Sequence, residues 1–531
     1  MADTDTKATP QLEVVQEAEG HHEYAPASVR GQLAGWHANR GDRSIARAII
    51  PTWKAGTTDD EVIYNPFRLF ARMKLMDWMY FLCGWWAWTC DGYDFFAVSV
   101  TLVEMTKQFG VAKHTLTTSI TLTLLFRSVG AVVFGLLADR YGRRWTLCVN
   151  MLLIALFEFA SGLCNTYTQF LGVRACFGIV MGGVWGQAMA TSIENVPVQA
   201  RGFCSGILQP GYSFGYLLAA VINLTVVPTS KYGWRSVYFI GAGFSVTSAI
   251  FRAVLPESKQ YREAREIARA EGKQKGQGKR FLKETGAMLK ANWIRVIWGI
   301  VTMAAFNFLS HGTQDLYPTY LQVSKGISPK AANISTIITN VFAIIGGAVA
   351  GYLSQYLGRR LCIIVFCLWC AAFIPLWILP HDIVGLTAGG SMILFGMQAT
   401  FGVVPIYLGE VSPPAFRASF AGICYQLGNM ASSAAAQIES TAGDRLKTTL
   451  PNGNVVPDYA TVQAMLVGIV LFFLITCVLL GPEADGSHFE QAKTATQEGA
   501  GVTETQDLVH GRGHLRRESV AYDEKNLSEK V

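Results

Sequence analysis

The feature that most constrains this chain is a series of twelve apolar segments, each about 20 residues long. As an α-helix, a segment of this length crosses the ~30 Å hydrocarbon core of a bilayer. Only 15% of the 531 residues are charged and 51% are hydrophobic, whereas soluble domains carry about 25% charged residues. We therefore predict an all-α membrane protein and exclude a set of ordinary soluble domains. The segments span 79–103, 117–138, 145–164, 168–190, 203–227, 236–255, 293–314, 331–353, 361–380, 384–408, 418–439 and 461–481.

Polar stretches flank and divide these segments. The tail at 1–76 has no apolar segment of the signal-peptide type and is expected to be mostly disordered. Residues 256–292 hold ten Lys or Arg against five acidic residues. The short loops do not fix the orientation, but this basic loop and the basic flank before the first segment place both tails in the cytoplasm. We expect six-helix bundles at 77–255 and 293–481 and a second cytoplasmic tail at 482–531.

The two halves of the chain carry the same motifs. The sequence from Gly135 to Arg144 recurs from Gly351 to Arg360, an offset of 216 residues. A Glu-x-x-Pro-x-x-x-Arg motif begins at Glu194 and again at 410, with the same offset. Two independent motifs that share one offset indicate a duplicated six-helix unit. Parallel six-helix repeats with a binding site between them are the architecture of the major facilitator transporters.

The first of these motifs resembles the major facilitator signature between the second and third helices. Its glycine permits a tight turn, and its acid can cap a helix or pair with an arginine across the bundle, which suits a gate with two arrangements. The second copy has Gln355 where the first has Asp139, so we expect an asymmetric gate. The predicted gating residues are Asp139, Arg140, Gly142, Arg143, Glu194, Arg201, Arg359, Glu410 and Arg417.

Ionisable side chains within the apolar segments are costly and are therefore functional candidates. Asn307, His311 and Asp315 are spaced by four residues, so they share one helical face. An imidazole titrates near neutral pH, which suits proton exchange with the neighbouring carboxyl. The alternative is a histidine satisfied by hydrogen bonds between helices. Asp91 lies 216 residues before Asn307 and is a further candidate for proton coupling, or else an ion-pair partner of an arginine.

The segment from Asn307 to Thr319 reads N-F-L-S-H-G-T-Q-D-L-Y-P-T. It resembles the signature N-x-x-[ST]-H-x-[ST]-Q-D-x-x-x-T of the fungal lactate/pyruvate–proton symporters, the Jen carboxylate transporter family. This resemblance implies proton-coupled uptake of lactate, pyruvate, acetate or propionate across the plasma membrane. A sister branch of that family prefers dicarboxylates such as succinate and malate. Pro318 is expected to end or kink the helix.

Arg127 lies halfway along the second segment, where a guanidinium can hold a carboxylate with two hydrogen bonds. The alternative is a structural pair with Asp91 or Asp94. Arg174 is the other arginine deep in a segment, and Glu158 is more consistent with a structural role. Polar and aromatic side chains mix at 209–216 and 425–429, either for ligand contact or for helix packing. The predicted substrate-binding residues are Arg127, Asn307, Ser310, His311, Gln314, Tyr212 and Gln426, and the predicted proton-coupling residues are His311, Asp315 and Asp91.

Other functions find less support in the sequence. No G-x-x-x-x-G-K-[ST] motif for ATP is present, and no nucleophile–base or metal constellation suggests an enzyme. Neither a cofactor nor a metal nor nucleic acid is expected; the expected partners are a small carboxylate, a proton and the bilayer. The tails are candidates for binding cytoplasmic trafficking machinery. A Pro-Glu-Ser sequence at 256–258 keeps a sugar porter as an alternative, followed by a nutrient sensor.

Overall fold

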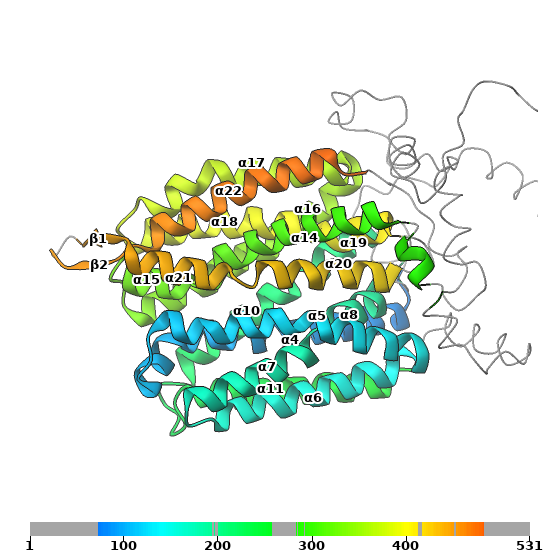
Figure 1. The fold of residues 1–531 in the computed structure, drawn as a ribbon, viewed down its shortest axis with the longest axis horizontal. Coiled ribbons are helices and arrows are strands. Elements are labelled where there is room, and N and C mark those ends of the chain that lie inside the picture. Colours follow the sequence, from blue (N-terminus) through cyan, green and yellow to red (C-terminus); the bar gives the residue numbers. More distant parts are fainter. Residues whose placement is uncertain are drawn as a thin grey trace, which may run out of the picture.

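The computed structural model describes residues 73–193, 196, 200–257, 283, 285–290, 292–412, 417–450 and 453–482. All but residues 73–76 and 482 of the predicted tails, and most of the predicted central loop, lie outside these residues. Figure 1 shows two groups of long helices lying side by side, with a short hairpin at one end. Ten helical segments in the described part are long and apolar enough to cross a membrane.

The first bundle contains residues up to 254. Four of its six spans are single helices. The fourth span is broken into two helices near Gly182, and the fifth is broken at Pro210. Its helices are α4 (Leu75–Phe109), α5 (Lys113–Tyr141), α6 (Arg143–Leu163), α7 (Tyr167–Met181), α8 (Val184–Ile193), α9 (Arg201–Leu208), α10 (Gly211–Thr225) and α11 (Arg235–Val254).

The second bundle begins at Trp293. As predicted, its first span breaks before Pro318, which occupies the first turn of α15. Its elements are α14 (Trp293–Gln314), α15 (Tyr317–Val323), α16 (Pro329–Leu357), α17 (Arg359–Ile378), α18 (Ile383–Gly402), α19 (Val404–Val411), α20 (Arg417–Ser432), α21 (Ala435–Arg445), β1 (Lys447–Thr449), β2 (Val455–Pro457) and α22 (Tyr459–Leu480). The ten helical segments that are apolar enough to cross a membrane correspond to ten of the twelve predicted segments. Helix α4 corresponds to the first predicted segment and the α20–α21 pair to the eleventh.

The same pairs of helices pack in both bundles. In the first, α4 packs on α10, α5 on α7 and α6 on α11; in the second, α14 packs on α20, α16 on α18 and α17 on α22. Each pair in the second bundle is the counterpart of one in the first under the repeat. The predicted duplication is therefore present in the packing, and the fold is that of a major facilitator transporter.

The glycines of the repeated motif make two tight connections. Gly142 joins α5 to α6 with φ 93° and ψ 160°, and Gly358 joins α16 to α17 with φ 82° and ψ 159°. A side chain is strained at such positive φ values, whereas glycine is not. The motif therefore recurs with its conformation as well as its sequence.

Large apolar side chains face outward on the helices farthest from the contact between the bundles. Examples are Leu156 and Phe159 on α6, Leu368 on α17, and Ile469 and Phe472 on α22. In water, an exposed apolar surface of this extent is unfavourable, but in hydrocarbon it is not. These helices therefore form the lipid-facing surface.

The two bundles contact each other at both ends of the molecule. At the end that carries β1 and β2, here called the hairpin end (Figure 1), Thr117 on α5 lies 3.0 Å from Gln437 on α21, and His114 lies 3.4 Å from Asp444. At the opposite end, Ser205 on α9 donates to the carbonyl of Gly402 at 2.9 Å. The space between the bundles is thus enclosed from both sides.

Candidate functional site

A small cavity lies between the bundles. Its volume is about 10 Å³, enough for about one water molecule, so a larger ligand requires its walls to separate. The residues come from helices of both repeats, as expected for a site between two bundles. They are Arg127, Gln209, Tyr212, Asn307, Ser310, His311, Gln398, Phe401, Tyr425 and Asn429.

Five of the seven predicted substrate-binding residues line this cavity: Arg127, Tyr212, Asn307, Ser310 and His311. The other two lie one contact behind it. Gln314 donates to Ser310 Oγ at 3.0 Å, and Gln426 accepts from Asn429 at 2.9 Å. The predicted list lacks Gln209, Tyr425 and Asn429, which the sequence indicated only as parts of the mixed segments at 209–216 and 425–429. The sequence prediction missed Gln398 and Phe401 of α18 altogether. A lone amide inside an otherwise apolar segment was the signal that could have found Gln398.

Arg127 forms a buried ion pair with Asp91. Its Nη2 donates to Asp91 Oδ2 at 2.7 Å, and both side chains are buried. This is the structural pairing that the sequence left open. Asp91 thus faces Arg127 and is not among the cavity-lining residues. The pair neutralises the arginine, so the guanidinium can remain in a membrane-embedded site at an acceptable cost.

Three hydrogen-bond donors of the cavity have no acceptor in hydrogen-bonding geometry among the described residues: Nε of Arg127, the hydroxyl of Tyr212, which lies beside that guanidinium, and Nε2 of Gln398. Gln398 is held in place because its Oε1 accepts from Ser213 Oγ at 3.1 Å. Buried donors without acceptors are unfavourable. A ligand rich in acceptors, such as a carboxylate, would satisfy all three.

His311 belongs to a directional chain of hydrogen bonds. The backbone carbonyl of Gly182 can only accept, so the Gln426 side chain, 3.3 Å away, presents its amide nitrogen to it. Gln426 Oε1 then accepts from Asn429 Nδ2, which leaves Asn429 Oδ1 to face His311 Nε2 at 3.4 Å. The chain therefore assigns a proton to Nε2 of His311.

The other nitrogen of His311 faces Asp315. Nδ1 lies 3.1 Å from Oδ2 and 3.2 Å from Oδ1 of this carboxyl. Because Nε2 already carries a proton, this contact is favourable only with a further proton between the two groups. The predicted pair on one helical face is confirmed as a contact, and its hydrogen bonds fit the proton-loaded form.

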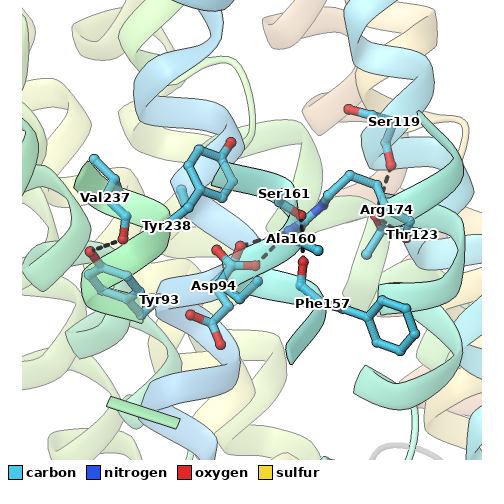
Figure 2. Close-up of polar contacts among 12 residues, drawn as sticks. Tyr93, Asp94, Ser119, Thr123, Phe157, Ala160, Ser161, Arg174, Val237 and Tyr238 are labelled. Carbon is cyan, nitrogen blue, oxygen red and sulfur yellow. Dashed lines mark hydrogen bonds and ion pairs between the residues drawn. The ribbon is translucent and has the colours of Figure 1, made fainter. Parts of the chain in front are cut away.

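Other buried ions form a separate cluster inside the first bundle, around Arg174 and Asp94 (Figure 2). Arg174 Nη1 donates to Glu158 at 2.9 Å, and Nη2 donates to the backbone carbonyl of Asp94 at 3.3 Å. The Asp94 carboxyl accepts from Ser245 Oγ at 2.9 Å. None of these residues lines the cavity. Arg174 and Glu158 thus pair with each other, consistent with a structural role.

Three predicted gating residues whose side chains the structure describes, Arg201, Arg359 and Glu410, lie at the end opposite the hairpin. Arg359 holds Glu410 through two hydrogen bonds, Nε to Oε2 at 3.1 Å and Nη2 to Oε1 at 3.0 Å. Arg201 donates from Nε to the carbonyl of Val196 at 3.1 Å. A Cβ on Gly202 would approach Arg359 Nη1 to 3.3 Å, so this pair lies against the opposite bundle.

Other gating residues are only partly described. Gly142 and Arg143 lie at the junction of α5 and α6. Glu194 and the side chains of Asp139, Arg140 and Arg417 lie outside the described part of the chain. The acid–arginine contacts that the sequence predicts for these residues therefore remain untested.

Comparison with known proteins agrees with this architecture. A sequence model described as "Sugar (and other) transporter" matches residues 82–494. The chain is 33% identical over 433 residues to the "Carboxylic acid transporter protein homolog" of Saccharomyces cerevisiae, covering 79% of this chain and 70% of the relative. It is 24% identical over 360 residues to the "Cis,cis-muconate transport protein" of Acinetobacter baylyi, covering 67% and 85%.

Among solved structures, the xylose transporter XylE of Escherichia coli, in a partially occluded inward-open conformation, has a TM-score of 0.60. The match covers 78% of this chain and 100% of XylE, at 16% sequence identity, and therefore shows the fold alone. These proteins are transporters rather than enzymes, in agreement with the prediction from the sequence. By its family match, its repeated bundles and the cavity between them, this chain belongs to the sugar (and other) transporter family of the major facilitator superfamily.

Proposed function

We propose that this protein is a proton-coupled symporter of short monocarboxylates, such as lactate, pyruvate, acetate and propionate. The observation that carries this proposal is the lining of the cavity between the bundles. Three donors without acceptors lie in the same cavity as His311, whose Nδ1 faces the Asp315 carboxyl. A carboxylate substrate would accept hydrogen bonds from the three donors, and the His311–Asp315 pair would carry the co-transported proton.

The names of the relatives support a carboxylate as the substrate class. The Saccharomyces cerevisiae relative is named a carboxylic acid transporter homolog, and the Acinetobacter baylyi relative a cis,cis-muconate transporter. The resemblance of 307–319 to the signature of the lactate/pyruvate–proton symporters points to the same class.

In the proposed mechanism, the bundles rock about the cavity and expose it to one side at a time. The carboxylate binds near Arg127 while the His311–Asp315 pair carries the proton, so one anion and one proton cross together without net charge. We propose that the hairpin end faces outward and the Arg359–Glu410 end inward. We also propose that the protein lies in the plasma membrane, with both tails and the central loop in the cytoplasm. The bounds of the tails, the loop and the two bundles are those that the sequence predicts.

The charge inventory favours a monocarboxylate over a dicarboxylate. A second carboxylate calls for a second cation, but Arg174, the other deep arginine, is paired with Glu158 outside the cavity. Arg127 is thus the single arginine among the cavity-lining residues.

Labelled lactate uptake into cells without carriers of their own tests the proposal. We expect faster uptake at about pH 5 than at about pH 7.5, because a higher external proton concentration drives a proton-coupled symporter inward. A protonophore should abolish accumulation, and pyruvate should compete. Competition mainly by succinate would identify a dicarboxylate transporter, whereas no uptake at normal surface expression would contradict carboxylate transport and direct attention to sugars.

A further inference from the structure

A second buried carboxyl group, Glu439 on α21, lies close to the cavity and has no role in the mechanism above. Its side chain is fully buried. A Cβ placed on Gly312, the residue after His311, would lie 3.2 Å from Glu439 Oε1. Glu439 therefore packs against α14 next to the His311–Asp315 pair.

This carboxyl lacks a cationic partner among the described residues. Its Oε2 accepts from Gln463 Nε2 on α22 at 3.3 Å, and its Oε1 accepts no hydrogen bond. Asp91 and Glu158 each pair with an arginine, whereas the Asp94 carboxyl, like that of Glu439, accepts only from an uncharged side chain, Ser245 Oγ. A lone carboxylate without exposure to water is strongly unfavourable.

The surroundings favour a bound proton rather than a negative charge. From α14, Asp315 repels a charge on Glu439, and His311 is engaged with Asp315. From α5, His114 is paired with Asp444, and Lys113 also lies near that carboxyl. The described part of α22 presents the neutral Gln463.

The hydrogen bonds of Glu439 and Gln463 lead to the same conclusion. Gln463 Oε1 is also without a partner. The contact therefore has one donor, Gln463 Nε2, and two oxygens that accept no hydrogen bond, Glu439 Oε1 and Gln463 Oε1. A proton on Glu439 converts one of those acceptors into a donor. A protonated carboxyl beside a primary amide can then form two opposed hydrogen bonds.

We propose that Glu439 is a second proton-binding residue, which exchanges its proton with Asp315 during transport. In the transfer, the Glu439 carboxylic acid gives its proton to the Asp315 carboxylate and becomes a carboxylate itself. A proton arriving from the hairpin end then restores Glu439, which lies one to two helical turns before Arg445, the exposed last residue of α21. This proposal rests on the proposed symport function.

The test is Glu439→Gln in the full-length chain, since glutamine has the same shape and mimics the protonated form. We expect loss of lactate accumulation against its gradient and a flat dependence of uptake on external pH between about 5 and 7.5. Exchange of labelled for unlabelled lactate at equal pH should persist, because the loaded carrier can reorient without releasing a proton. Glu439→Asp should restore part of the pH dependence.

Glu104→Gln is the matched control, since Glu104 is an exposed carboxyl on α4. It should leave accumulation unchanged at equal surface expression. Accumulation by Glu439→Gln at the wild-type level would overturn the proposal. Loss of both lactate exchange and lactate accumulation would also overturn it, because this result indicates a structural role for Glu439. If the unaltered protein itself accumulates no lactate, the symport function fails instead.

Discussion

Arg127 combines two tasks that the sequence presented as alternatives. It is paired with Asp91 through Nη2, and it also lines the cavity, with no acceptor in hydrogen-bonding geometry at its Nε. The planar guanidinium permits both, because its five donors point in fixed and separate directions. An ammonium group in the same place is a single point of charge.

Arg127→Lys is therefore expected to weaken lactate binding while the ion pair with Asp91 persists. A hydrogen bond to a charged group contributes about 1.5–3 kcal/mol, which corresponds to a KM roughly 10- to 150-fold higher. The measurement is the KM of lactate uptake at equal surface expression. Arg235→Lys, a change on α11 outside the cavity, is the control, and an unchanged KM for Arg127→Lys would argue against carboxylate binding at this residue.

His311 is the second residue whose chemistry can be tested alone. Asparagine can replace its hydrogen bonds but does not titrate, so His311→Asn should lose the increase in uptake between about pH 7.5 and pH 5. Exchange of lactate at equal pH should decline less. The exposed His381 provides the control variant His381→Asn. A retained ratio of uptake at the two pH values would exclude His311 as the proton carrier.

At the scale of elements, the sharp connections between helices depend on glycine. Gly142 links α5 to α6 with φ 93°, and substitution by alanine is expected to cost about 1–3 kcal/mol. Gly142→Ala should lower the Tm of the detergent-purified protein. Gly135→Ala serves as control, because its helix position has open space for a Cβ and alanine favours the helix. Equal Tm values for the two variants would contradict the strain argument.

The broken spans belong to this scale as well. Pro318 ended a helix as the sequence predicted, because proline has no amide hydrogen to continue the ladder. The break at Gly182 was not predicted. It frees the carbonyl that anchors Gln426 and thus fixes the direction of the chain to His311.

At the scale of the whole molecule, the backbones of the two bundles approach each other closely where α9 crosses α16. A Cβ on Gly206 would lie 2.6 Å from the carbonyl of Gly347 and 2.7 Å from Gly351 Cα. Both contacts are with backbone atoms, which cannot move aside as a side chain can. The closed arrangement at this end therefore requires glycine.

Gly206→Val is accordingly expected to prevent closure at the end opposite the hairpin. Transport should fall by at least about tenfold, since alternating access needs both arrangements. Lactate binding to the purified protein should be retained, because the cavity residues are unchanged. Gly243→Val on α11, where a Cβ meets nothing within 4 Å, is the control. Wild-type uptake by Gly206→Val would show that this close approach is not needed for the cycle.

The number of spans, the repeat and half of the cavity-lining residues could be predicted from the sequence alone. These features follow from local patterns: hydropathy over about 20 residues fixes a span, and the four-residue spacing of Asn307, His311 and Asp315 fixes a shared face. The signature segment therefore identified His311 and Ser310 as cavity residues before their neighbours were known.

Which helix faces contact each other could not be predicted from the sequence and depends on the tertiary packing. The choice of Asp91 rather than Asp94 as partner of Arg127 depends on the rotation of α4 against α5. The places of Gln398 in the cavity wall and of Glu439 beside Gly312 depend on how α18 and α21 pack. Such contacts join residues distant in sequence, and small rotations of long helices determine them, so no local pattern of residues specifies them.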